Sequence, residues 1–273
     1  MGKKIDKSKQ DYKKIWAETC TLPWCTLVTT GRTGTDFFQS LLDSHPNVFV
    51  YNGSLYFHTF WESALTVQHS QNPILSDFLD EFIGANLIAL KSHYEPLERK
   101  DQLGESRDCS IDIDTKQFKT HVSGLLEAQT INAKNALTAI YVAYALCIGQ
   151  DISQKKLFFH HVHHVRKVDG YIADFPDSKI ICMTRDPRAM YVSGVENWRK
   201  FNKSTDNPSY PLYVLWRAVD EISHLTKYKD GRLKVLKMED LAEEKTLHAV
   251  CQWLNIEFNP CLKEATWAGL RWW

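Results

Sequence analysis

The chain has 273 residues with 33 basic and 33 acidic side chains, so its formal net charge at neutral pH is zero. This balance excludes a global field that would attract nucleic acid or an anionic membrane, so any anion binding must be local. The length suits one α/β domain with a large core, and we expect one domain over residues 1–273. Seven cysteines without a CxxC pair favour a reducing, cytoplasmic compartment over a disulfide framework.

The apolar segments are too short for a membrane span. The longest runs over residues 139–148, whereas a spanning helix needs about 20 residues. The charged first 18 residues contain no apolar core of a signal peptide. We therefore expect neither a membrane span nor a secretory leader.

Strands alternate with helices along the chain. The elements expected in the first half are a helix within 1–20, a strand at 26–30, a helix at 36–44, a strand at 47–51, partly helical structure at 54–85, a strand or buried helix at 85–92, a loop at 94–118 and helices within 118–148. Those expected in the second half are a strand at 157–165, helices at 168–175, 188–200 and 212–228, strands at 179–184 and 233–238, and a last helix at 241–254. This order predicts an α/β fold with a central parallel sheet covered by helices on both faces and a largely helical insertion at about 54–155.

The segment CTLVTTGRTGTDFFQSLLDSHPNV, residues 25–48, predicts an anion-binding loop between a strand and a helix. Glycines allow a tight turn, Thr33 and Thr35 offer hydroxyls, and Arg32 offers a cation beside the first turn of the helix. The loop is not a Walker A motif, because no Lys follows Gly34. Taken alone, it is also compatible with a simple helix cap at Thr35 or Asp36.

The segment KIICMTRDPRAMYVSGVENW, residues 179–198, repeats this design. A buried strand leads into a polar turn and a helix, with Arg185 and Ser193 eight residues apart. Two anion subsites at neighbouring strand ends suggest a ligand with two separated phosphate-like groups.

The two segments together resemble the nucleotide-binding signatures of the sulfotransferase superfamily, which has a P-loop NTPase-like fold. The C-terminal VLKMEDLAEEKTLHAVCQWLNIEF is also similar to that family. The resemblance implies an enzyme that uses 3′-phosphoadenosine 5′-phosphosulfate (PAPS) and releases 3′-phosphoadenosine 5′-phosphate (PAP). It assigns Arg185 and Ser193 to the 3′-phosphate. It assigns to the 5′-phosphosulfate the first loop, namely Arg32, Thr33, Gly34, Thr35, Asp36 and Phe37.

Two positions depart from the family pattern. Asp36 stands where many relatives have Ser or Thr, and a carboxylate facing an anion would repel it. We therefore expect Asp36 to turn away and cap the helix. The sequence also stops at ATWAGLRWW, where relatives often continue into a segment over the nucleotide, and Arg271 is a candidate for that role.

Five histidines are candidates for the general base that takes the acceptor's proton. The resemblance favours His163 in the strand LFFHHVHHV, and it places His160 and His161 near a family lysine. Alternation along a strand puts His161 and His163 on one face and His160 and His164 on the other. His93 in LKSHYEP ranks next, followed by His58. A metal site at His161 and His163 lacks Cys or carboxylate partners at ligand spacing, so no metal is expected.

The acceptor is expected to be a small molecule, a sugar or a lipid headgroup that offers a hydroxyl or an amine. Residues 54–155 are expected to form its pocket, although the aromatic side chains near that segment also suit a core: Tyr51, Tyr56, Phe57, Phe60 and Trp61. Two alternatives stay open, a non-catalytic nucleotide-binding module of the same fold and an unusual P-loop kinase. A homodimer is compatible with these features.

Overall fold

The centre of the molecule is a five-stranded sheet in the order β2-β3-β1-β4-β5, and all four strand pairings are parallel. The computed structural model describes residues 7–28, 31–51, 53, 55–68, 74–90, 102–202, 209–228 and 230–273. The strands are β1 (Trp24–Val28), β2 (Val48–Val50), β3 (Leu157–Val162), β4 (Lys179–Thr184) and β5 (Leu233–Lys237). The predicted α/β fold is confirmed, with a shorter β3 than the sequence suggested.

The helices connect the strands and cover the sheet. Before β3 they are α1 (Lys7–Thr19), α2 (Thr35–Asp43), α3 (Phe57–Gln68), α4 (Leu75–Leu90), α6 (Thr115–Leu126) and α7 (Ala133–Cys147). After β3 they are η1 (Val165–Lys167), α8 (Val168–Asp174), α9 (Pro187–Asn202), α10 (Ser209–Leu225), η2 (Met238–Ala242), α11 (Glu244–Leu254) and η3 (Pro260–Lys263). Among the residues described, no helix combines the length and apolar character of a membrane span.

The structure decides two sequence expectations in this region. Residues 85–90 belong to helix α4, so the helix is correct there and the alternative strand is not. The loop expected to reach residue 118 ends at Asp114, whose carboxylate accepts hydrogen bonds from the backbone N–H groups of Lys116 and Gln117. An aspartate in this position starts a helix by satisfying N–H groups that lack a partner within it.

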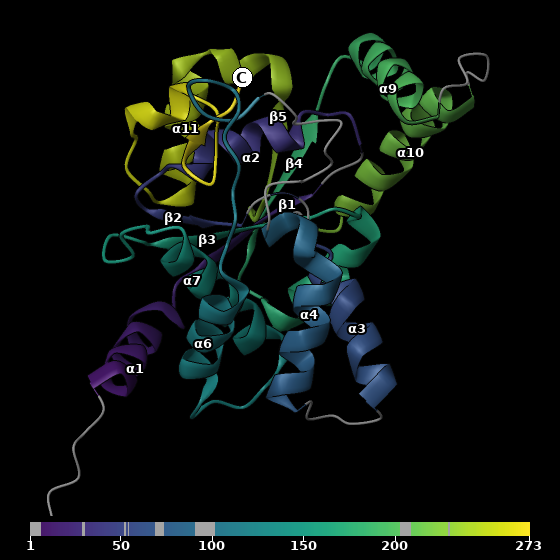
Figure 1. Ribbon diagram of the computed structural model, residues 1–273. Helices are drawn as coiled ribbons and strands as arrows, with labels where there is room; N and C mark the ends of the chain where they lie inside the picture. The colour runs from purple at the N-terminus through teal and green to yellow at the C-terminus, as the bar shows by residue number, and fades with distance from the viewer. Residues whose placement is uncertain are drawn as a thin grey trace, which may run out of the picture.

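The sheet separates two cores because successive side chains of a strand point to opposite faces. One face carries Leu27 and Phe159 and packs under α2 and α11. The other face carries Trp24 and Phe158 and packs against the larger group of helices that includes α3, α4, α6, α7 and α8. Figure 1 shows these two layers, with α9 and α10 beyond the β4 side of the sheet.

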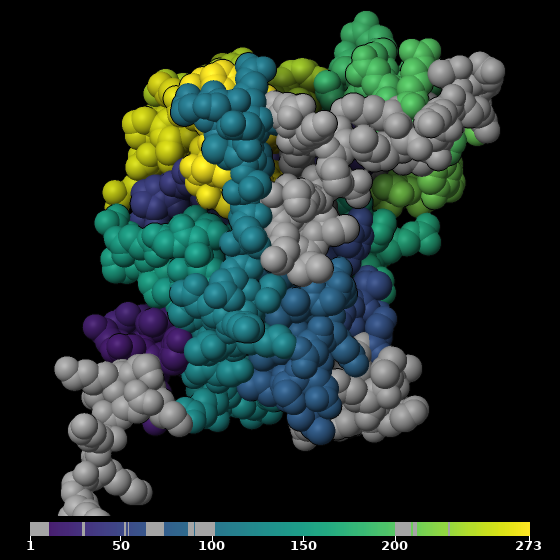
Figure 2. Space-filling model, viewed as in Figure 1, coloured from purple at the N-terminus to yellow at the C-terminus, as the bar shows by residue number. Residues whose placement is uncertain are grey.

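The C-terminal residues form the hairpin β6 (Thr266–Trp267) and β7 (Leu270–Arg271), which lies against the segment after residue 101. Gly104 N donates to the Arg271 carbonyl oxygen at 2.8 Å, and Trp273 Nε1 donates to the Gly104 carbonyl oxygen at 2.8 Å. Figure 2 shows this contact as the blue-green strip beside the yellow C-terminal atoms. Arg271 stacks on Trp273 at 3.7 Å and pairs with Glu105 at 3.6 Å, so its side chain is engaged in this contact.

Candidate functional site

The loop between β1 and α2 turns through three residues with left-handed backbone conformations. Gly31, Arg32 and Gly34 have φ angles of 90°, 55° and 84°. Glycine adopts this conformation without steric cost, whereas an arginine pays about 1–2 kcal/mol. A Cβ atom at Gly34 would also collide with the sulfur of Met238 in η2. Turns of this kind direct backbone N–H groups toward a common point and form anion-binding concavities.

Helix α2 starts directly after this loop, and its N-cap is Gly34. The N-cap is therefore neither Thr35 nor Asp36, the two residues that the sequence suggested, and Asp36 lies in the first turn of the helix. Asp36 Oδ1 lies instead 3.9 Å from Nδ1 of His161 on β3. The positive end of the α2 dipole therefore faces the loop, where it favours an anion.

The Arg32 side chain joins this first loop to α9. Its Nε and Nη2 donate to Ser193 Oγ at 3.1 and 3.0 Å, and its Nη1 donates to Asn197 Oδ1 at 3.3 Å. Arg185 Nη1 donates to the Arg32 carbonyl oxygen at 3.3 Å. The two segments singled out in the sequence thus contact each other directly, because β1 and β4 are neighbours in the sheet.

Asn197 was missed at the sequence level, although the signal was present. It lies four residues after Ser193 and therefore shares its face of α9. A search along that face from Ser193 would have found it.

The second segment borders an open depression at the start of α9, lined by Arg185, Arg188, Ala189, Val192, Ser193 and Glu196. The turn before it is braced by Asp186. Hydrogen bonds from Arg188 hold the pKa of the Asp186 carboxyl far below its ordinary value. The Asp186 backbone N–H also donates to Glu239 Oε1 at 2.9 Å, which ties the turn to η2.

Thr33 carries a polar atom that the described structure leaves unsatisfied. Its side chain is buried, and Oγ1 has no hydrogen-bond partner among the described residues. A buried hydroxyl in this state costs about 1–3 kcal/mol. An oxygen atom of a bound anion would satisfy it.

The remaining loop residues lie around this point. Thr35 is buried in the first turn of α2, and Phe37 is 37% exposed at the surface of that helix.

His160 and His161 point to opposite faces of β3, as strand alternation predicts. His160 Nδ1 pairs with the Tyr141 hydroxyl at 2.8 Å, and its ring stacks on Tyr171 at 5.4 Å. His161 faces α2, where its Nδ1 lies 3.1 Å from Gln39 Oε1. Burial lowers the pKa of both imidazoles, so both are neutral at pH 7.

Gln39 determines which nitrogen of His161 carries the proton. Its amide nitrogen donates to the carbonyl oxygens of Tyr51 and Gly53 at 2.5 and 3.2 Å. Its Oε1 must therefore accept, so His161 Nδ1 is the donor. His161 Nε2 then carries the lone pair, and it has no hydrogen-bond partner among the described residues.

His163 and His164 follow the end of β3, so strand alternation no longer governs them. The His163 ring lies 5.7 Å from the His161 ring and 4.9 Å from the Tyr56 ring. Burial first, and then the neighbouring His161 and His164, lower the pKa of His163 to about 3. His163 is therefore a neutral imidazole beside the first loop.

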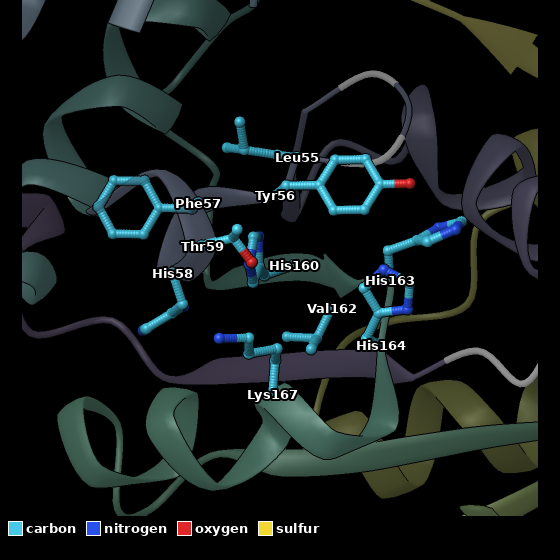
Figure 3. A pocket seen from close by; sticks show the side chains of 10 residues that line it. All are labelled: Leu55, Tyr56, Phe57, His58, Thr59, His160, Val162, His163, His164 and Lys167. Atoms are coloured by element: carbon cyan, nitrogen blue, oxygen red, sulfur yellow. The ribbon is translucent and has the colours of Figure 1, made fainter. Parts of the chain in front are cut away.

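A pocket of about 250 Å³, including its opening to solvent, lies beside these histidines. Figure 3 shows His163, His164 and the Tyr56 ring at one end and Phe57 and His58 at the other. His58 Nε2 pairs with Asp174 Oδ2 at 3.0 Å.

Most of the aromatic residues singled out in the sequence belong to the core rather than to this pocket. Tyr51 packs on Tyr141 and Tyr144, and Trp61 packs between Phe57 and Phe78. Tyr56 differs because it is 45% exposed. His93, the alternative base, lies outside the described residues.

Comparisons with known proteins identify a family and a shared fold. The model of the sulfotransferase family matches residues 26–260. The sulfotransferase domain of the curacin biosynthetic pathway superposes with a TM-score of 0.55 at 18% identity, covering 88% of this chain and 77% of that one. The sulfotransferase domain of the Synechococcus PCC 7002 olefin synthase gives a TM-score of 0.51 at 18% identity, covering 88% and 75%. A search of curated proteins gave no match. These solved structures share the fold, and because the family model spans most of the sequence, the chain belongs to the sulfotransferase family.

Proposed function

We propose that this protein transfers the sulfonyl group of PAPS to a hydroxyl or amine of a small-molecule, sugar or lipid acceptor. The observation that carries the proposal is the contact between Arg32 and Ser193, which joins the two anion-binding segments into one site. Arg185 lies at the same junction. A single ligand that carries two separated phosphate groups suits such a site. Each half of the site offers an arginine and the N-terminus of a helix, α2 in one half and α9 in the other.

The residues present fit PAPS. In this proposal the first loop, residues 31–37, holds the 5′-phosphosulfate, and the unsatisfied Thr33 hydroxyl donates to one of its oxygens. Arg185 and Ser193 hold the 3′-phosphate. Asn197 adds a side-chain amide to this subsite, and the oxygen of that amide accepts a hydrogen bond from Arg32.

His163 is the base in this proposal because it lines the pocket and directly follows β3, the neighbour of the strand β1 that leads into the first loop. The acceptor oxygen or nitrogen attacks sulfur, the bond from sulfur to the phosphate oxygen breaks, and the acceptor's proton moves to His163. Its low pKa keeps the imidazole neutral, so its lone pair is available, although a pKa of about 3 also makes it a weak base. A negatively charged donor nearby would raise this pKa and make the imidazole a stronger base.

The acceptor would enter beside Tyr56, whose ring lies against His163 and His164. A half-exposed tyrosine offers both an apolar face and a hydroxyl. We propose that segment 54–155 contributes to acceptor binding chiefly through this first part, residues 55–59, which lines the pocket.

Calorimetric titration with PAP tests the nucleotide site. Arg185→Ala removes a partly buried cation from the 3′-phosphate, so the dissociation constant should rise by about 30-fold or more, equivalent to about 2 kcal/mol. Arg199→Ala removes the same charge from an exposed position on α9 and should change affinity by less than about 3-fold. Unchanged affinity in Arg185→Ala would refute the assignment.

Two further measurements separate the alternatives. Magnesium-dependent ATP binding without PAP binding would favour the kinase. PAP binding without turnover of labelled PAPS across a broad acceptor panel would favour the non-catalytic module.

A further inference from the structure

Arg217 on α10 is a cation that the sequence motifs did not reveal. Its Nη2 lies 3.5 Å from the position that a Cβ of Gly31 would occupy, at the beginning of the first loop. Helix α10 also packs against η1, which follows His164 directly. The positive charge of Arg217 contributes to lowering the pKa of both His163 and His164. Arg217 therefore lies near the first loop, on a helix that also packs against the turn after the histidines.

Glu221 forms an ion pair with this guanidinium. Its Oε1 lies 3.2 Å from Arg217 Nε, one helical turn away. The side chains are 5% exposed for Glu221 and 23% for Arg217, so water screens the pair weakly. Because the Glu221 carboxylate lies beside Nε of Arg217, the Nη atoms of the guanidinium are directed at the loop. A planar guanidinium fixed in this way is organised before any ligand arrives.

Lys167 also lines the pocket beside these histidines, and its ammonium group pairs with Glu62 Oε2 at 2.7 Å. Burial keeps His161 and His163 neutral. Arg32 is engaged with Ser193 and Asn197 in the direction of α9. A sulfonyl group facing the histidines would carry negative charge on its own oxygens. Further negative charge develops on the bridging oxygen, which leaves with the 5′-phosphate, as its bond to sulfur breaks. Arg217 is placed to balance it.

We propose that Arg217 binds the sulfonyl oxygens of PAPS and that Glu221 positions its guanidinium for this contact. This inference rests on the proposed function. It assigns each group of PAPS to its own part of the site. Arg185 and Ser193 bind the 3′-phosphate, and the first loop binds the 5′-phosphate. Helix α10 supplies the cation beside the sulfonyl group.

Calorimetry with PAPS and with PAP tests the contact, because PAP lacks the sulfonyl group and keeps both phosphates. Arg217→Gln should weaken PAPS binding by about 10-fold or more and PAP binding by less than about 3-fold. An equal loss for both ligands, or no loss for either, would overturn the assignment. Arg166→Gln is the matched control. Arg166 lies in η1 and pairs with Asp220 of α10 at 3.2 Å, but its side chain is 76% exposed.

Arg217→Gln leaves Glu221 buried without its partner and could unfold the protein. The double variant Arg217→Gln, Glu221→Gln removes both charges and preserves shape, so it should fold and show the same selective loss of PAPS affinity. Equal affinity of the double variant and the wild type for PAPS would also overturn the proposal.

The same titrations distinguish failure of this inference from failure of the proposed function. Wild-type protein that binds neither ligand would refute both. Wild-type protein that binds PAP and PAPS, with variants that lose neither selectively, would leave the function standing and remove Arg217 from the sulfonyl subsite.

Discussion

Two buried tyrosines beside β3 differ in the partners of their hydroxyl groups. The Tyr141 hydroxyl pairs with His160 Nδ1 at 2.8 Å, whereas the Tyr51 hydroxyl is buried without a hydrogen-bond partner among the described residues. Their rings lie 5.8 Å apart in one aromatic cluster. The pair therefore isolates the energetic value of one hydrogen bond in a constant environment.

Tyr141→Phe should lower the free energy of unfolding by about 1–3 kcal/mol, because it leaves a buried His160 nitrogen without a partner. Tyr51→Phe removes a hydroxyl that has no partner to lose and should change stability by less than about 0.5 kcal/mol or increase it. Urea denaturation of both variants measures the difference. Equal losses would mean that the Tyr141 hydroxyl does not hold His160.

At the level of elements, the N-terminus of α2 and the helical turn η2 meet at Gly34. This residue has a φ angle of 84°, and a Cβ would collide with the Met238 sulfur. Gly149 has a φ angle of 71°, but nothing lies within 4 Å of where its Cβ would be. The two glycines thus share a backbone conformation and differ in the approach of a second element.

Gly34→Ala should destabilise the protein by about 1–3 kcal/mol more than Gly149→Ala does, since both pay the conformational cost and only the first adds a clash. It should also weaken PAP binding, because the loop must shift. Thermal unfolding compares the two stabilities, and calorimetry measures PAP binding. Equal destabilisation would show that Met238 moves aside freely.

Across the whole molecule, burial lowers the pKa of several imidazoles below that of free histidine: His45, His160, His161, His163 and His164. Below about pH 6.5 the unfolded chain therefore binds more protons than the native protein does. The free energy of unfolding should fall as the pH drops through this range, by up to about 1.4 kcal/mol per pH unit for each such residue.

His163→Asn tests this linkage, because the pKa of His163 is lowered to about 3. Between pH 7 and pH 5, the free energy of unfolding of this variant should fall by about 2 kcal/mol less than that of the wild type. Identical slopes for this variant and the wild type would contradict the assigned burial of His163.

The parts of the site that were visible in the sequence are those carried by local patterns. A buried strand followed by glycines and an arginine located the first loop, and a second strand followed by Arg185 and Ser193 located its neighbour. Alternation along β3 separated His160 from His161. Local rules missed the cap of α2, because the left-handed Gly34 occupies the N-cap and leaves Asp36 beside His161.

The sequence by itself determined the family, the α/β fold and the two strand–turn–helix segments. Each of these depends on residues that are close together in the chain or on one parallel sheet. Only the tertiary structure decided that Arg32 contacts Ser193, that Gln39 orients His161 and that Arg217 lies against Gly31. These contacts join residues more than a hundred positions apart. They depend on how α2, α9 and α10 dock on the sheet, and docking is set by packing over whole helices rather than by any single motif.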